Sequence, residues 1–227
     1  MNPNRPAFDP VIQKKIADCG VVAVLVIDDA QQAVPLARSL LAGGINAMEL
    51  TLRTDAALDA LTAIRAEVPD MLAGIGTILT PAQVGQVVKA GAAFGVAPGC
   101  NRRVLEAAQA AGLSFAPGIC TPSDIETALE FGCRVLKFFP AETCGGLKHL
   151  ESMAAPYQHL GLRYLPLGGL TAKNMTTYLA SPLVPAVGGS WLAKRETIKI
   201  GAWDIIIDAA REARTAIDAL RATKKSS

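Results

Sequence analysis

The feature that most constrains this chain is an alternation of short apolar segments with Ala-rich helical segments, repeated eight times along the sequence. Most of the apolar segments are continuously apolar, which is typical of strands that are buried on both faces. Strands that alternate with helices indicate a parallel sheet. Over 227 residues, eight such units predict an α/β fold, a (β/α)8 TIM barrel with a short N-terminal helix.

The expected strands are the apolar segments, at residues 20–26, 45–50, 71–77, 92–97, 114–116, 135–139, 164–167 and 184–187. The expected helices lie before and between them, at residues 9–18, 29–41, 55–67, 81–90, 102–111, 122–131, 147–155, 173–179 and 203–222. We therefore expect one domain over residues 1–227. Within it, residues 1–19 form an N-terminal helical extension and residues 222–227 form a polar tail.

An open, doubly wound sheet is the alternative architecture for the same alternation. A dinucleotide-binding sheet of that kind needs a G-x-G-x-x-G sequence after its first strand, and the chain has none there. Residues 74–77 (GIGT) carry only part of that spacing. The sequence therefore favours the barrel.

Composition argues against several classes of protein. The chain is 51% hydrophobic and 19% charged, with a net charge of +2, so it can bury a sizeable core and is not expected to bind nucleic acid. Five widely spaced cysteines without a CxxC pair indicate reduced thiols in a cytoplasmic protein. With two histidines we expect no metal site, and we expect no cofactor. No apolar run reaches the ~20 residues that span a membrane, and the first ten residues do not resemble a signal peptide.

Lys137 lies inside the apolar segment RVLKFFP at residues 134–140, and it is the only one of the ten lysines in such a place. Burying an unpaired ammonium group is costly. This lysine therefore either extends its charged end to water or is present partly as a free amine. A free amine attacks carbonyl groups. The segment alone leaves both interpretations open.

The carboxyl ends of barrel strands share one mouth, and several distinctive residues fall there. Glu49 is a carboxylate embedded in the second apolar segment, while Thr77, Pro98 and Phe139 end or follow three others. Lys137 and Glu49 facing one pocket would supply a nucleophile and a proton-transfer group. The same two residues would also suit a buried ion pair that joins two strands. We name them as candidate catalytic residues and the other three as candidate substrate contacts.

Glycine pairs follow the seventh and eighth strands, Gly168-Gly169 and Gly188-Gly189, and the second pair is followed by Ser190. Such residues leave backbone N–H groups open to an anion, and this is the usual phosphate position in the fold. Tight turns with left-handed residues also use glycine, but the placement of both pairs favours phosphate. Arg53, just beyond the second strand, is a candidate for a substrate carboxylate because of its two-pronged geometry; a solvated loop arginine is the alternative.

Four motifs resemble, in the same order, the 2-keto-3-deoxy-6-phosphogluconate (KDPG) aldolase family, also called the KHG/KDPG aldolases. They are ELTLR at residues 49–53, GIGT at 74–77, LKFFPAE at 136–142 and GGSW at 188–191. The resemblance covers about residues 21–208. It implies a class I aldolase, a lyase that forms a Schiff base without a metal on a (β/α)8 barrel. It also implies a role in the Entner–Doudoroff pathway of carbohydrate metabolism and a homotrimer.

By this resemblance, the Schiff-base lysine of the family falls on Lys137 and its proton-transfer glutamate falls on Glu49. Arg53 and Thr77 correspond to the residues that hold the pyruvate carboxylate. The phosphate-binding positions fall on Gly168, Gly169, Gly188, Gly189 and Ser190. The expected function is cleavage of KDPG to pyruvate and glyceraldehyde 3-phosphate. A sugar-phosphate isomerase or epimerase and a non-catalytic phosphosugar-binding barrel are the alternatives.

One position departs from the family pattern. The usual Pro-Thr-Gly-Gly after the seventh strand reads PLGG at residues 166–169, so Leu167 replaces a threonine whose hydroxyl would face the substrate. Loss of a hydroxyl in a polar site can change which sugar is preferred. The galactonate-derived epimer of KDPG and 4-hydroxy-2-oxoglutarate (KHG) therefore stay open as substrates.

Overall fold

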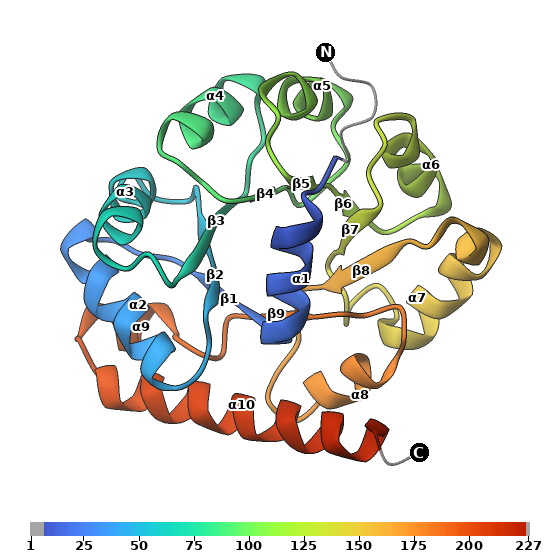
Figure 1. Cartoon of the computed structure of the whole chain (residues 1–227). Coiled ribbons are helices and arrows are strands. Elements are labelled where there is room, and N and C mark those ends of the chain that lie inside the picture. The colour runs from blue at the N-terminus through green and yellow to red at the C-terminus, as the bar shows by residue number, and fades with distance from the viewer. Residues whose placement is uncertain (1–6, 226–227) are drawn as a thin grey trace.

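Parallel strands form a ring at the centre of the computed structural model, which describes residues 7–225 (Figure 1). Their bounds are β1 Val21–Leu25, β2 Ala47–Thr51, β3 Leu72–Gly76, β4 Gly95–Val96, β5 Phe115–Ala116, β6 Gly118–Ile119, β7 Val135–Phe138, β8 Arg163–Pro166 and β9 Val187–Gly189. Six strands are hydrogen-bonded in the order β5-β4-β3-β2-β1-β9, and three in the order β6-β7-β8. Helices lie outside this ring, so the predicted (β/α)8 TIM barrel is confirmed.

Pro117 divides one barrel position into two short strands. β5 pairs with β4, whereas β6 pairs with β7, and the proline between them has no N–H group to continue the ladder. On the other side of the barrel, β8 lies beside β9. The two hydrogen-bonded sheets therefore close into one ring in which β5 and β6 together occupy a single position.

The helices lie between successive strands, apart from α1, which precedes β1, and α9 and α10, which follow β9. Their bounds are α1 Pro10–Cys19, α2 Ala33–Ala42, α3 Ala57–Glu67, α4 Pro81–Lys89, α5 Arg102–Ala111, α6 Pro122–Glu130, α7 Gly146–Ala154, α8 Met175–Ala180, α9 Arg195–Lys199 and α10 Trp203–Lys225, with short 3-10 helices at Ala30–Gln32 and Ala155–Leu160. The prediction missed α9 and the 3-10 helix at Ala155–Leu160, which are too short to carry a helical apolar period, whereas the 3-10 helix at Ala30–Gln32 lies within the helix expected at residues 29–41.

The expected bounds of the last strand and of the carboxyl-terminal tail were wrong. The last strand covers residues 187–189 rather than 184–187, because it includes two glycines, which are depleted in strands and do not extend an apolar pattern. The expected polar tail at residues 222–227 is helical through Lys225, since α10 continues and the Lys224 ammonium donates to the carbonyl of Leu179. Residues 1–6 and 226–227, which belong to the expected extension and tail, lie outside the described residues.

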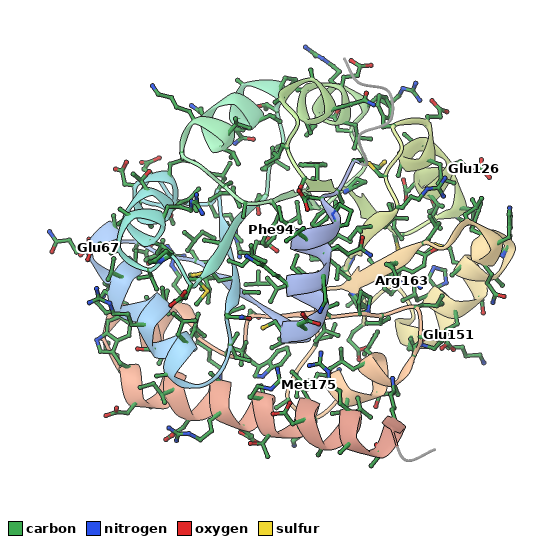
Figure 2. The ribbon with its side chains drawn as sticks, in the orientation of Figure 1. Glu67, Phe94, Glu126, Glu151, Arg163 and Met175 are labelled. Atoms are coloured by element: carbon green, nitrogen blue, oxygen red, sulfur yellow. The ribbon has the colours of Figure 1, made fainter. Side chains whose placement is uncertain are left out.

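The segment before β1 closes the amino-terminal end of the barrel. α1, in blue at the centre of Figure 1, lies across the ring, and the Phe8 ring before it lies 6.4 Å from the Phe94 ring, centroid to centroid. Figure 2 shows Phe94 near the barrel centre, whereas Glu67, Glu126 and Glu151 lie at the periphery. The opposite end of the barrel, at the carboxyl ends of the strands, is therefore the end that is free to hold a functional site.

Candidate active site

A cavity of about 320 Å³ opens at the carboxyl ends of the barrel strands. Ten of the eleven predicted site residues line it: Glu49, Arg53, Thr77, Pro98, Lys137, Phe139, Gly168, Gly169, Gly188 and Ser190. Gly189 does not line the cavity. A Cβ at that position would lie 2.4 Å from the ring of Trp191, so Gly189 leaves room for the tryptophan that packs beside it.

Four further residues line the cavity without having been predicted to do so from strand ends: Val24, Thr51, Leu167 and Leu170. Leu167 was recognised only as a departure from a family pattern. Thr51 carried a usable signal, because it is a hydroxyl residue at the end of an apolar strand, and it is 3% exposed. Val24 and Leu170 carry no signal that separates them from core residues.

Lys137 and Glu49 meet inside this cavity from different parts of the barrel. Lys137 belongs to β7 and Glu49 to β2. The Lys137 Nζ lies 3.4 Å from the Glu49 Oε1, and the two side chains are 6% and 2% exposed. The lysine therefore does not extend to bulk water, and a base lies directly beside its amine. An ion pair alone would be poor evidence of added stability.

Two neighbours shape the surroundings of this pair. The Phe139 ring presents its face to the lysine, with Nζ 5.3 Å from the ring centroid, a geometry that favours a cation. A Cβ at Gly76 would lie 1.6 Å from the Glu49 Oε1. The Glu49 carboxylate therefore occupies the space that a side chain at residue 76 would fill.

Arg53 is held at the edge of the cavity by a buried threonine. Its Nε donates to the Thr51 Oγ1 over 3.2 Å, and that hydroxyl donates to the Leu25 carbonyl over 2.9 Å. Within residues 7–225 no carboxylate forms an ion pair with Arg53. The terminal nitrogens of its guanidinium group therefore remain available to an anion in the cavity.

Thr77 has a strained backbone. Its φ of 62° makes it the one non-glycine residue in the described part of the chain with a positive φ, a conformation that β-branched residues rarely adopt. Such strain tends to occur at functional sites. Here it lies on the cavity wall, one residue beyond the end of β3.

The loop after β8 presents backbone N–H groups to the same cavity. Gly168 and Gly169 adopt left-handed φ values of 95° and 82°, which glycine tolerates best. The N–H groups of Gly168, Gly169 and Leu170 donate no hydrogen bond to any of residues 7–225. With the exposed Ser190 across the opening, this loop can receive an anion.

The cysteines near the mouth do not enter the cavity. Burial raises the pKa of Cys100 to about 11, and burial together with a hydrogen bond to Cys144 raises the pKa of Cys120 to about 11. Both are therefore thiols, rather than nucleophilic thiolates, at neutral pH.

Neither a metal-ligand cluster nor a membrane-spanning helix is found in the described part of the chain. No group of three or more His, Cys, Asp or Glu side chains in residues 7–225 could hold a metal ion. No helix among the same residues is long and apolar enough to cross a membrane.

Comparison with known proteins gives one consistent result. Residues 12–209 match the family model described as "KDPG and KHG aldolase". The 2-dehydro-3-deoxy-phosphogluconate aldolase of Pseudoalteromonas atlantica and the KHG/KDPG aldolase of Escherichia coli K12 are each 42% identical over 193 residues, which cover 85% of this chain and 89% and 90% of those proteins. The crystal structure of a KDPG aldolase from Legionella pneumophila, with pyruvate captured as a covalent carbinolamine intermediate, matches with a TM-score of 0.85 and 37% identity, covering 89% of this chain and 97% of that one.

Proposed function

This chain belongs to the KDPG and KHG aldolase family, and we propose that it is a class I aldolase that cleaves KDPG to pyruvate and glyceraldehyde 3-phosphate. The observation that carries the proposal is the buried contact between Lys137 and Glu49, with the amine 3.4 Å from the carboxylate in a cavity at the barrel mouth. An amine beside a base is the arrangement that carbonyl chemistry through a Schiff base requires.

The reaction begins when the neutral amine of Lys137 attacks the C2 ketone of the substrate. Proton transfers convert the carbinolamine hydroxyl to water, which leaves and gives an iminium ion joined to the enzyme. The positive iminium accepts electrons from the C3–C4 bond. The face of Phe139, 5.3 Å from Nζ, stabilises this cation more than it stabilises the neutral amine.

Glu49 moves the protons of the cleavage step. It removes the C4 hydroxyl proton, directly or through a water molecule, as the C3–C4 bond breaks and glyceraldehyde 3-phosphate forms. The electron pair of that bond leaves an enamine on Lys137. The carboxyl group of Glu49 then returns its proton to C3, and addition of water to the resulting iminium releases pyruvate and restores the amine.

The remaining cavity residues orient the substrate. Arg53 and Thr77 hold the carboxylate next to the reacting ketone, and Pro98 forms part of the cavity wall. The N–H groups at Gly168 and Gly169, with Gly188 and Ser190 opposite, hold the distal phosphate. Gly189 does not line the cavity and leaves room for the Trp191 ring beside it. Fixing both ends turns a bimolecular encounter into an intramolecular reaction.

Cleavage of KHG is a second candidate activity. The Escherichia coli relative carries both substrates in its name, and KHG needs the same ketone, carboxylate and C4 hydroxyl but has no phosphate. Leu167, which is 6% exposed and lines the cavity, replaces a hydroxyl with an apolar surface near the sugar hydroxyl groups. This replacement disfavours a substrate that depends on a hydrogen bond at that position.

The test is to add pyruvate, reduce with borohydride, and map the modified peptide by mass spectrometry. We expect a reduced pyruvate adduct on Lys137 and none in a Lys137→Ala variant, while Lys148→Ala, which removes an exposed lysine of α7, keeps the adduct. No adduct on folded protein would favour the isomerase or epimerase alternative. Pyruvate binding without release of product from KDPG would favour the non-catalytic alternative.

Two further properties belong to this proposal because they follow from the family resemblance. The enzyme is a homotrimer and works in the cytoplasm. Light scattering of the purified protein tests the first, with three times the chain mass of 23.7 kDa as the expected result. Fractionation of the source cells tests the second.

A further inference from the structure

Glu142 lies five residues beyond Lys137 and has no part in the chemistry described above. Its backbone N–H donates to the carbonyl of Gly168 over 3.0 Å, and the N–H of Ala141 donates to the carbonyl of Leu167 over 2.8 Å. A Cβ at Gly169 would lie 2.6 Å from the Glu142 Cβ, so the glutamate packs directly on this glycine. The main chain and the side chain of Glu142 therefore both border the loop of residues 168–170.

The carboxylate of Glu142 is held by a buried phenol. Tyr178, on α8, is 2% exposed, and its hydroxyl donates to the Glu142 Oε1. Among residues 7–225 the Tyr178 hydroxyl has no second hydrogen-bond partner, so it depends on this carboxylate to satisfy a buried donor. Burial and the same hydrogen bond raise the pKa of Tyr178. The phenol thus stays protonated and keeps donating to Glu142.

This arrangement keeps a negative charge beside an anion-receiving loop without letting it enter. Neither Glu142 nor Tyr178 lines the cavity, although Glu142 contacts two of its glycines. The three free N–H groups of residues 168–170 would attract any mobile carboxylate within reach. A Glu142 side chain released from Tyr178 would compete with a substrate phosphate and would repel it.

We propose that Glu142 and Tyr178 are a pair of positioning residues for the phosphate end of the substrate. The pair fixes the loop of residues 168–170 in the shape that receives a phosphate, and it directs the Glu142 carboxylate away from the loop. The inference rests on the proposed aldolase function and extends it, since it makes the preference for a phosphorylated aldehyde depend on a contact outside the cavity.

The experiment compares two aldehydes in the direction of synthesis, with pyruvate saturating. Glyceraldehyde 3-phosphate needs the loop, whereas unphosphorylated glyceraldehyde does not. For Tyr178→Phe we expect kcat/KM for the phosphorylated aldehyde to fall roughly tenfold to hundredfold, mostly through KM, which is the effect of losing one hydrogen bond to a charged group. We expect kcat/KM for glyceraldehyde and the yield of the borohydride-reduced pyruvate adduct to stay at the wild-type level.

Matched variants separate positioning from general structure. Glu142→Gln keeps an oxygen that accepts from Tyr178, and we expect it to behave as wild type or to bind phosphate more tightly. Glu142→Ala removes the carboxylate together with the contact, so we expect a selective loss that is smaller than in Tyr178→Phe and comes from the loop shape alone, and the double variant should match Glu142→Ala. Tyr157→Phe is the control, because the Tyr157 hydroxyl donates to Glu126 over 3.0 Å, away from the cavity.

Three outcomes would overturn the inference. Equal losses for both aldehydes would make the pair a general support of the fold, and unchanged selectivity in Tyr178→Phe and Glu142→Ala would make it dispensable. Additive losses in the double variant would mean that the two residues act separately. Failure of the aldolase function itself would show differently, as the absence of a pyruvate adduct in the wild-type protein. If Tyr178→Phe does not fold, Glu142→Ala and Glu142→Gln decide the question alone.

Discussion

Single residues that need not touch substrate determine where the reactive groups of this site lie. Thr51 is the clearest case, since its hydroxyl accepts from the Arg53 Nε and donates to the Leu25 carbonyl. The hydroxyl thus connects the arginine to the barrel strand beside it. Without the Thr51 hydroxyl as an acceptor, the Arg53 guanidinium group keeps its charge but is no longer held in one orientation toward the cavity.

We expect Thr51→Val to raise KM for pyruvate in the synthetic reaction by roughly threefold to tenfold, with a smaller change in kcat. The valine has the same shape and removes only the hydroxyl, and a hydrogen bond of this kind contributes about 1 kcal/mol. Thr51→Ser restores the hydroxyl and should return KM close to the wild-type value. Equal KM values for the two variants would show that Thr51 does not orient Arg53.

A second prediction concerns Gly76, where we expect a substitution to lower activity without lowering stability. A Cβ at this residue would lie 1.6 Å from the Glu49 Oε1, at the mobile end of a side chain that can rotate away. We expect Gly76→Ala to fold and to lose about 100-fold or more in kcat, as when a general base is displaced. Thermal unfolding should stay near that of wild type.

The control for Gly76→Ala is the same substitution at Gly85. This exposed residue lies in α4, and a Cβ there would meet nothing within 4 Å. Gly85→Ala should keep full activity and gain about 1 kcal/mol of stability from helix propensity. A fully active Gly76→Ala would mean that Glu49 reaches its working position by another route.

The same residues show how far sequence predicts such a site. Lys137 and Glu49 were predicted because a charged residue stands out within an apolar strand. The roles of Thr51, Gly76 and Glu142 were not predicted, because each depends on a neighbour from another strand or helix. Contacts of that kind form only when strands and helices come together in the barrel, and no local sequence pattern encodes them.

At the scale of elements, the helix starts at Pro81 and Pro122 were predicted to the residue, whereas most strand bounds were not. Thr80 and Thr121 each accept from the backbone N–H three residues later, and Gln83 and Asp124 complete the capping boxes. A cap followed by proline is a local signal. β4 and β5 are two residues each, shorter than their apolar segments, because where a ladder ends depends on the neighbouring strand.

We expect Thr121→Ala to lower the free energy of unfolding by about 1 kcal/mol. The Thr121 hydroxyl accepts from the Asp124 N–H over 3.2 Å, while the Asp124 carboxylate accepts from the N–H groups of Cys120 and Thr121. Urea unfolding with a constant m-value would measure the loss. Thr121→Ser keeps the cap and should lose much less, so equal losses for the two variants would point to the missing methyl group instead.

At the scale of the whole molecule, contacts between the two ends of the chain support the barrel. Arg214 and Arg221 of α10 donate to the carbonyls of residues 17–19 at the end of α1. In Figure 1 the red α10 runs along one side of the ring and the blue α1 crosses it. These contacts help to hold α1 over the amino-terminal end, and the opposite end stays open as the active-site mouth.

A second long-range contact ties the loop after β1 to α9. The Arg195 Nε and Nη2 donate to the two oxygens of Asp28 over 2.8 and 2.6 Å. The hydrogen bond from Arg195 holds the pKa of the Asp28 carboxyl below its ordinary value of 3.8. A carboxyl with a lowered folded-state pKa contributes stability above the ordinary value, and this contribution disappears as the pH falls through the folded-state pKa.

We therefore expect Asp28→Asn to be less stable than the wild type at pH 7 and to approach it as the pH falls below about 4, where the wild-type carboxyl also loses its charge. Urea midpoints of both proteins at pH 7, 5 and 3 measure this difference. Asp208→Asn is the control, because the Asp208–Arg211 pair joins neighbouring residues on the surface of one helix and should contribute little. The stability deficit of Asp28→Asn relative to the wild type should therefore shrink between pH 7 and pH 3. A deficit that stays constant over this range would mean that the packing of the loop after β1, and not the charge of Asp28, connects this loop to α9.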